Sequence, residues 1–251
     1  MSDYMLKKEP YLVVMLLIFS LGAKSQKSIT DQQLVWYGYF LSLQFNDKWY
    51  LQTEVQERHF INPVAQHQFL IRSDIHRTLG TNGWETSAGL CAFFQNANDP
   101  DATVNLTVPE LRPHIEFAYR QKAKVLTFDH RYRAEARFFH QTNIARTSLE
   151  DGFEFDHVRL RYRLQATVPV WKLDDKRALK VKVNDEVLLN AGSKITKNVF
   201  DQNRIYTGLS FDALPKLTFD VGYLNWFQQR STGDFYNRNI LRFSVSQKIT
   251  L

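Results

Sequence analysis

The sequence predicts an all-β protein, a single antiparallel transmembrane β-barrel with short periplasmic turns and longer extracellular loops. Two observations support this fold class: apolar and charged residues alternate over segments of about ten residues or more, and short and long connections alternate between those segments. A tilted strand that crosses a bilayer needs about 9–11 residues, whereas strands in soluble sheets average about 5–6. Closure into a barrel pairs every backbone group, as lipid requires.

The first 25 residues are expected to be a cleavable export signal. Lys7 and Lys8 form a basic start, residues 11–19 are apolar, and Ala23 and Ser25 are small residues at the cleavage-defining positions. The apolar stretch is about half as long as the ~20 residues of a transmembrane helix. A buried strand or short helix is the competing interpretation. We therefore expect a barrel domain over residues 26–251, located in the bacterial outer membrane.

Eleven strands can be recognised along the rest of the chain. Their expected ranges are 33–45, 49–58, 66–79, 84–94, 110–121, 125–138, 158–168, 178–190, 202–211, 216–227 and 237–251. Bacterial single-chain barrels have an even number of strands, so we expect twelve, with ten as the alternative. The missing strand would involve residues 26–32, or one of the segments is divided wrongly.

The early strands show the alternation weakly and the central ones show it clearly. In 49–58, Trp49 and Val55 oppose Glu54 and Arg58, and in 84–94 the face opposite Trp84 includes the single cysteine, Cys91. A lone cysteine cannot form an internal disulfide, and we interpret it as a small buried apolar residue.

The central strands place apolar side chains on one face and charged ones on the other. In 110–121, Leu111, Ile115 and Phe117 oppose Arg112 and Glu116. The strands 125–138 and 158–168 continue this pattern with arginine at almost every second position. A helix at this spacing would distribute the arginines around its axis.

The connections support the same topology. Short turns rich in Asn, Asp, Gly and Pro are expected at 46–47, 80–83, 121–124, 172–177 and 212–215. Longer polar stretches lie at 95–108, 141–152, 191–200 and 228–236. Outer-membrane barrels have this asymmetry between their two ends.

Several segments resemble the DUF2490 family of outer-membrane proteins of uncharacterised function. They are Trp36 after Asp31, the Asp-His-Arg-Tyr-Arg of 129–133, the Arg-Leu-Arg-Tyr-Arg of 159–163, the Gln-Asn-Arg-Ile-Tyr-Thr-Gly of 202–208, and Gly222 with Tyr223. The last strand resembles the terminal signal that barrel-assembly machinery reads, although it ends on Leu251 where Phe is more usual. The resemblance implies an outer-membrane location and adds no catalytic residue.

The inward charged face is the candidate functional feature. The lumen charge cluster is expected to contain Arg112, Glu116, Arg120, Asp129, Arg131, Arg133, Glu135, Arg137, Arg159, Arg161, Arg163 and Arg204. The wider inward set adds Arg58, Arg72, Arg238, Arg242, Glu54, Asp74, Glu85, Glu110 and Asp220. Buried charges must be paired or hydrated. Pairing would give a plugged structural or interaction barrel, and hydration would give a small pore that prefers small anionic solutes.

Other functions have weaker support in the sequence. A lipid hydrolase or acyltransferase would use His130 or His140 with Thr147 or Ser148, but no lipase-like nucleophile elbow is present, so we expect no enzyme. The seven histidines (His59, His67, His76, His114, His130, His140 and His157) lack metal spacing, and we expect no cofactor. Behind an export signal the arginine runs do not indicate nucleic acid. A ligand-binding barrel and a soluble periplasmic barrel stay as alternatives, and the oligomeric state is open.

Overall fold

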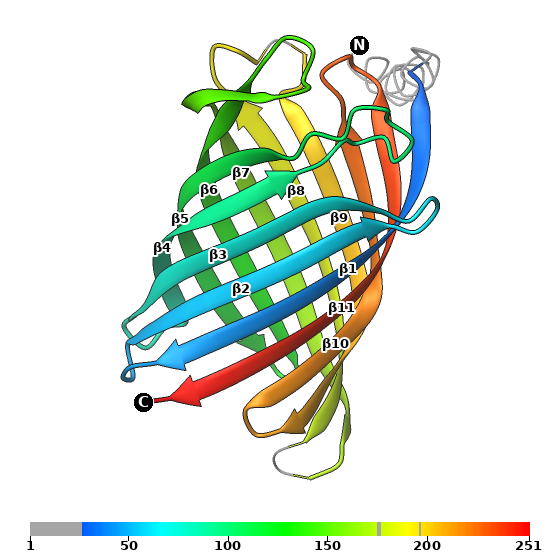
Figure 1. Ribbon diagram of the computed structural model, residues 1–251. Coiled ribbons are helices and arrows are strands. Elements are labelled where there is room, and N and C mark those ends of the chain that lie inside the picture. The colour runs from blue at the N-terminus through cyan, green and yellow to red at the C-terminus, as the bar shows by residue number, and fades with distance from the viewer. Residues whose placement is uncertain (1–26, 175–176, 196) are drawn as a thin grey trace, which may run out of the picture.

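The computed structural model describes residues 27–174, 177–195 and 197–251, which form a closed barrel of eleven strands (Figure 1). The strands are β1 (Ile29–Gln44), β2 (Trp49–Phe60), β3 (Ala65–Leu79), β4 (Trp84–Gln95), β5 (Val108–Ala123), β6 (Leu126–Thr142), β7 (Leu149–Lys172), β8 (Ala178–Ala191), β9 (Phe200–Leu214), β10 (Leu217–Gln229) and β11 (Phe235–Thr250). No helix in these residues is long and apolar enough to cross a membrane. The expected export signal, residues 1–25, lies outside the described residues.

The barrel closes through a parallel pair of strands, and this corrects the expected strand count. Sequence neighbours pair antiparallel all around the sheet, but β1 and β11 pair parallel, from Ile29 opposite Phe235 to Gln44 opposite Thr250. An odd number of alternating strands brings the first and last into the same direction, so a parallel pair is the only way to close it. The favoured count of twelve, and the alternative of ten, are therefore wrong. Residues 29–32 extend β1 and form no additional strand.

The two ends of the barrel differ. The turn end carries the β1–β2, β3–β4, β5–β6, β7–β8 and β9–β10 connections and the end of β11, and the loop end carries the other connections and the start of β1 (Figure 1). The longest connection, β4–β5, is at the loop end, as expected.

The expected loop at 141–152 is partly wrong, because β7 begins at Leu149 and not near Val158. The β6–β7 ladder continues past the expected boundary, with His140 opposite Phe153 and Thr142 opposite Leu149. Both faces of this extension are largely exposed, so its sequence has no reason to alternate. The backbone pairing there has no sequence signature.

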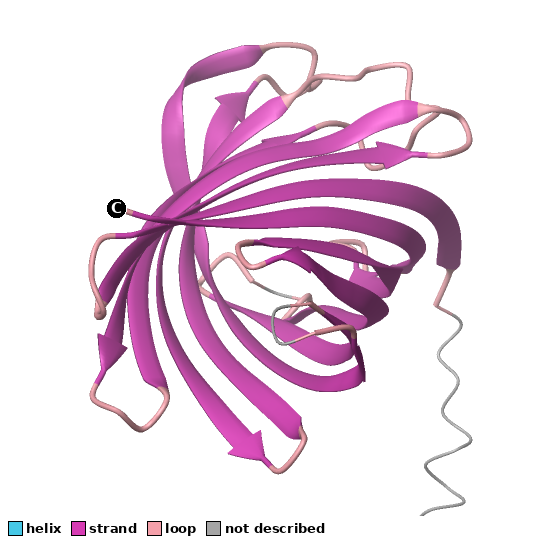
Figure 2. Cartoon of the chain, turned by 90° about the horizontal axis from the view of Figure 1, so that it is seen from below, coloured by secondary structure: helices cyan, strands magenta, loops and turns pink. Residues whose placement is uncertain are grey.

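The charged faces of the strands point inward and the apolar faces point outward. Glu135 is 1% exposed and Arg133 is also buried, whereas Ile115 and Phe117 on the outer face are 57% and 49% exposed. Viewed from below, the strands wrap into one ring around this interior (Figure 2). A soluble barrel would have the opposite arrangement, with the apolar face inside.

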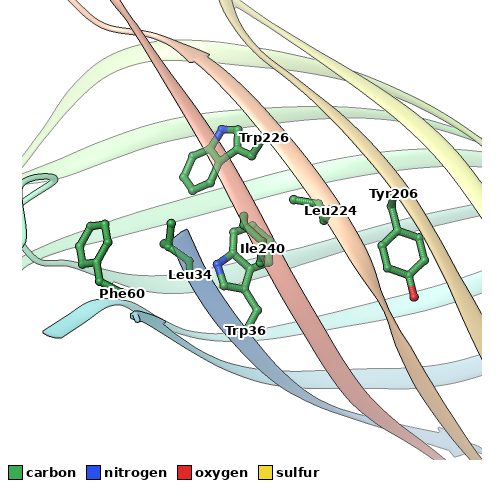
Figure 3. Packing of buried hydrophobic residues seen from close by; sticks show 7 residues of the cluster. All are labelled: Leu34, Trp36, Phe60, Tyr206, Leu224, Trp226 and Ile240. Atoms are coloured by element: carbon green, nitrogen blue, oxygen red, sulfur yellow. The ribbon is translucent and has the colours of Figure 1, made fainter. Parts of the chain in front are cut away.

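One sector of the interior is apolar. A cluster of seven buried residues comes from β1, β2, β9, β10 and β11: Leu34, Trp36, Phe60, Tyr206, Leu224, Trp226 and Ile240 (Figure 3). Cys91 faces inward on β4 and packs with Leu70 and Phe93, which confirms its interpretation as a small buried residue.

Candidate functional site: the charged interior

The β6–β7 register places like charges directly opposite one another. Arg131 faces Arg163, and Arg133 faces Arg161. Directly opposed like charges destabilise a sheet, so this pairing holds only if carboxylates supply counter-charge. Those carboxylates come from β5, β6 and β8.

Glu135 of β6 is the most enclosed of these carboxylates. Arg161 donates to it at 2.6 Å and Arg159 at 2.8 Å, and a third guanidinium, that of Arg133, lies 3.8 Å away. Water cannot hydrate a carboxylate that is 1% exposed, so these arginines provide its solvation. The arrangement ties β6 to β7 through charge-assisted bonds.

Glu116 and Glu186 extend the network on either side. Glu116 of β5 accepts from Arg133 at 2.7 Å, and Glu186 of β8 accepts from Arg131 and from Arg161 at 2.8 Å. Arg131 also lies 3.6 Å from Glu116. Basic and acidic groups therefore alternate across four neighbouring strands, β5 to β8.

Two further pairs lie toward the ends of the cluster. Near the loop end, Glu110 accepts from both Arg112 and Arg137. At the turn end, Arg120 donates to Asp129 at 2.6 Å and is mostly exposed. Glu110 and its two arginines thus belong to the packed interior. The Arg120–Asp129 ion pair is a solvated contact at the rim that contributes little to stability.

All twelve residues of the predicted lumen charge cluster lie on inward-facing strand positions, and ten of them take part in ion pairs with one another or with a neighbouring carboxylate. The exceptions are Arg163 and Arg204, for which no ion pair is found among the described residues. The sequence prediction missed Glu186 and Asp201, which bind Arg161 and Arg159 respectively.

Arginines in the apolar sector lie on aromatic rings. The guanidinium of Arg58 is 3.8 Å from the centre of the Trp36 ring, and that of Arg238 is 4.2 Å from the Trp226 ring. Arg204 lies 4.9 Å from Trp226. Cation–π contact partly compensates a guanidinium that has no carboxylate beside it.

Each of the eleven strands places a buried side chain in the interior toward the loop end. We call this set the closing layer, and it comprises, in strand order, Leu34, Phe60, His67, Phe93, Glu110, Glu135, Arg159, Leu188, Gln202, Trp226 and Arg238. His67 of β3 packs on Phe60 of β2 and also on Trp226 of β10, with ring centres 5.9 Å apart in the second contact. The layer therefore makes contact across the barrel and not only along its wall.

Comparison with known proteins identifies the family. A family model described as a protein of unknown function, DUF2490, matches residues 33–237. The chain belongs to the DUF2490 family. No curated protein matches it. Among solved structures, LpxR from Salmonella typhimurium is similar to this DUF2490 barrel with a TM-score of 0.46 and 11% sequence identity, covering 80% of this chain and 83% of that chain.

The DUF2490 barrel has a cavity on each side of the closing layer. The turn-end cavity has a volume of about 630 Å³ and the loop-end cavity about 940 Å³. Gln95, Arg137 and Gln228 line both, so the two cavities share part of their walls.

The β4–β5 loop of the DUF2490 barrel is tied across the loop end by Asn98. Its side-chain oxygen accepts from Arg238 at 3.0 Å and lies 3.1 Å from His67 Nε2, and its backbone oxygen accepts from Gln32 at 2.7 Å. These bonds join the loop to β11, β3 and β1, and the loop lines the loop-end cavity.

The residues considered for catalysis lie at both ends of β6 in the DUF2490 barrel. Thr147 and Ser148 lie in the β6–β7 turn, where the Asn143 side chain accepts from both backbone amides. His130 lies near the turn end and contacts the Tyr162 hydroxyl at 3.0 Å. His130 and the two hydroxyl residues therefore occupy opposite ends of β6. His140 lies at the loop end of β6, near the turn, and its Nδ1 atom is 3.1 Å from the backbone oxygen of Gln141.

Proposed function

We propose that this chain is an outer-membrane β-barrel whose lumen is closed by the closing layer, and that it acts as a structural or interaction barrel without conducting solutes. The observation that carries the proposal is that every one of the eleven strands contributes a buried side chain to this layer. Partners would then meet the barrel at its loop end or on its outer wall.

The outer face supports placement in a bilayer. Its exposed side chains are mainly aliphatic and aromatic, and each strand has at least the ~9–11 residues that a tilted membrane strand needs. Trp49 and Trp84 stand on the outer face at the turn end, where β2 and β4 begin, and Trp84 stacks on Tyr119. Aromatic residues of this kind gather where a barrel meets the lipid headgroups.

Pairing of the interior charges favours a plug over a pore. Most inward arginines bond to buried carboxylates, and breaking a buried ion pair to hydrate a path costs about 3–5 kcal/mol. A pore would instead leave charged rings free to contact passing ions.

Membrane fractionation tests the location. We expect the protein in the outer-membrane fraction, extracted only by detergent, with a gel mobility that changes on heating. Recovery from the soluble periplasm without detergent would contradict the proposal.

Conductance in planar bilayers tests closure. We expect the wild-type barrel to show no steady current, and the variant His67→Ala with Trp226→Ala, which removes the contact across the layer, to show channel events. Thr147→Ala, at the exposed β6–β7 turn, is the matched control and should stay silent. A steady anion-preferring current through the wild-type protein would support the pore instead.

A further inference from the structure

The turn end of the barrel carries basic side chains that have no acidic partner. We call them the cation belt; they are exposed, make no ion pair among the described residues, and comprise Lys48, Arg77, Lys122, Lys124, Lys172 and Lys216. The carboxylates in the described parts of the five turns are Asp47 and Asp174, and Asp174 is bonded to Arg177 at 2.7 Å. Positive charge therefore prevails at this end of the protein.

The cation belt extends around the whole rim. Lys48 lies in the β1–β2 turn, Lys124 in the β5–β6 turn and Lys216 in the β9–β10 turn. Arg77 and Lys172 lie at the ends of β3 and β7, which lead into the two remaining turns. These five turns follow one another around the closed barrel and lie together at one end of it (Figure 1). A partner that meets all of these cations must therefore surround the barrel or cover its mouth.

Exposed tryptophans lie at the level of the cation belt. Trp49 directly follows Lys48, and its ring centre is 5.3 Å from the Arg77 guanidinium. Trp171, which is 64% exposed, directly precedes Lys172. Tryptophan side chains on the outer face of a membrane protein gather at the level of the lipid headgroups. The cations are therefore placed where the wall leaves the hydrocarbon and meets the headgroups.

The lysines of the belt make almost no contact within the protein. No side-chain hydrogen bond or ring contact is found for Lys48, Lys122, Lys124 or Lys172 in the part of the chain that the structure describes. Lys216 donates to the Thr250 hydroxyl at 3.3 Å. A long lysine stem can lie along apolar surface while its ammonium group reaches a polar layer. These side chains can therefore turn toward a partner outside the barrel without breaking an internal contact of the fold.

The loop end differs, because its unpaired cations are accompanied by unpaired carboxylates in the same region. Among the described residues these cations are Lys27, Arg146, Lys197 and Arg230. The carboxylates are Asp31, Asp99, Asp101, Glu150, Asp151 and Asp234. The two ends of the barrel therefore present different charge to their surroundings.

An anionic lipid leaflet is the partner that these observations favour. An anionic membrane surface attracts lysine and arginine side chains that lie close to it, and each contributes to the attraction. The leaflet surrounds the rim at the level of the tryptophans, whereas an acidic protein would dock on one side of the barrel. We propose that the cation belt binds the headgroups of anionic phospholipids in the leaflet around the turn end. This inference rests on the proposed location in a membrane.

Quenching of tryptophan emission by brominated lipids tests the proposal. The barrel is folded into phosphatidylcholine vesicles that contain a fixed fraction of brominated phosphatidylglycerol, which is anionic, or of brominated phosphatidylcholine, which has no net charge. At low ionic strength the anionic lipid should quench more strongly, as if it bound the rim about fivefold more tightly, the factor that one lysine near an anionic surface contributes. At about 1 M salt, where the screening length is about 3 Å, most of this preference should disappear.

Two variants with equal loss of charge locate the binding surface. The variant K48Q/K122Q/K124Q/K172Q removes four belt lysines that make no side-chain contact, so we expect it to fold and to lose most of the preference for the anionic lipid. The variant K27Q/R146Q/K197Q/R230Q removes four cations at the loop end and should keep the preference of the wild type.

Three results would overturn the proposal: equal quenching of the wild type by the two brominated lipids, a preference that persists in the turn-end variant, or an equal loss of preference in both variants. Failure of the membrane location is distinguishable, because neither lipid would then quench the outer tryptophans. An acidic polymer is the competing partner. If the two lipids quench equally, and polyglutamate binds the wild-type barrel in detergent but not the turn-end variant, the belt binds such a polymer instead of lipid.

Discussion

His114 of β5 is hydrogen-bonded to Asp74 of β3 across the whole width of β4. The His114 Nε2 and Asp74 Oδ1 atoms are 2.5 Å apart, and both side chains are buried. Gly89 of β4 stands between them in the strand register, opposite Asp74 on one side and His114 on the other. Since Gly89 has no side chain, nothing separates the two partners. Arg133 reaches the same carboxylate at 3.6 Å, so Gly89 allows three strands to share it.

Gly89→Ala should therefore destabilise the barrel. A Cβ atom at this position would collide with the Asp74 carboxylate and with the backbone oxygen of Ser73, so the His114 bond cannot form unchanged. We expect a loss of about 1–3 kcal/mol, the range for a buried polar group left without its partner. Urea unfolding of the barrel in lipid vesicles measures it.

A double-mutant cycle supplies the control. In an Asp74→Ala background the carboxylate is absent. Adding Gly89→Ala there should lower the free energy of unfolding by clearly less than it does in the wild type. Equal costs in the two backgrounds would show that the glycine acts independently of the Asp74 contact.

Glu135→Gln should be among the most damaging single substitutions in the interior. It keeps the shape of the side chain but leaves Arg159 and Arg161 without the carboxylate that they share. Breaking a buried ion pair costs about 3–5 kcal/mol. The matched control is Glu154→Gln, whose carboxylate pairs with Lys194 on the exposed loop end and whose loss should leave the unfolding curve unchanged. A similar shift for both variants would contradict the role assigned to Glu135.

The strand pattern and the inward face were readable from the sequence because they depend on a period of two. The strand starts at Trp49, Trp84 and Ala178 match the structure, since each follows a short turn that was recognisable from its Asn, Asp or Gly residues. The eleven strand segments were readable as well, but the expectation of an even strand number was wrong. Local patterns indicate strands one at a time, whereas the parallel pairing of β1 with β11 depends on the whole sheet.

The same reasoning explains which site residues were missed. Asp185 and Glu186 are adjacent carboxylates, so alternation alone does not say which of them points inward. Asp201 lies at the start of β9, where the pattern has only begun. The aromatic partners of Arg58, Arg204 and Arg238 were not predicted either. Trp36 and Trp226 occupy inward positions that otherwise hold charged residues, and only the packed interior shows why.

Disulfide trapping should detect the parallel closure. Tyr37 and Phe243 stand opposite one another on the outer face, and their rings stack with centres 5.9 Å apart. In a Cys91→Ala background, Tyr37→Cys with Phe243→Cys should cross-link on oxidation and change mobility on a non-reducing gel. Tyr37→Cys with Val245→Cys is the control. Val245 lies two residues further along β11 than Phe243, on the same face, so its Cα atom is beyond the ~7 Å limit for a disulfide with residue 37. Efficient cross-linking of the control pair alone would show a different register.

Fluorescence quenching by lipids brominated on their acyl chains should separate the outer tryptophans from the inner ones. Trp84 is 43% exposed on the outer wall, whereas Trp226 is 2% exposed within the closing layer. The quencher reaches only rings that face lipid, so Trp84→Phe should lower the quenchable fraction of the emission. Trp226→Phe should raise that fraction, because it removes a protected emitter and leaves the outer ones in place. The opposite pair of shifts would mean that the apolar wall does not face the bilayer, and the proposed membrane location would then fail even if the barrel fold stands.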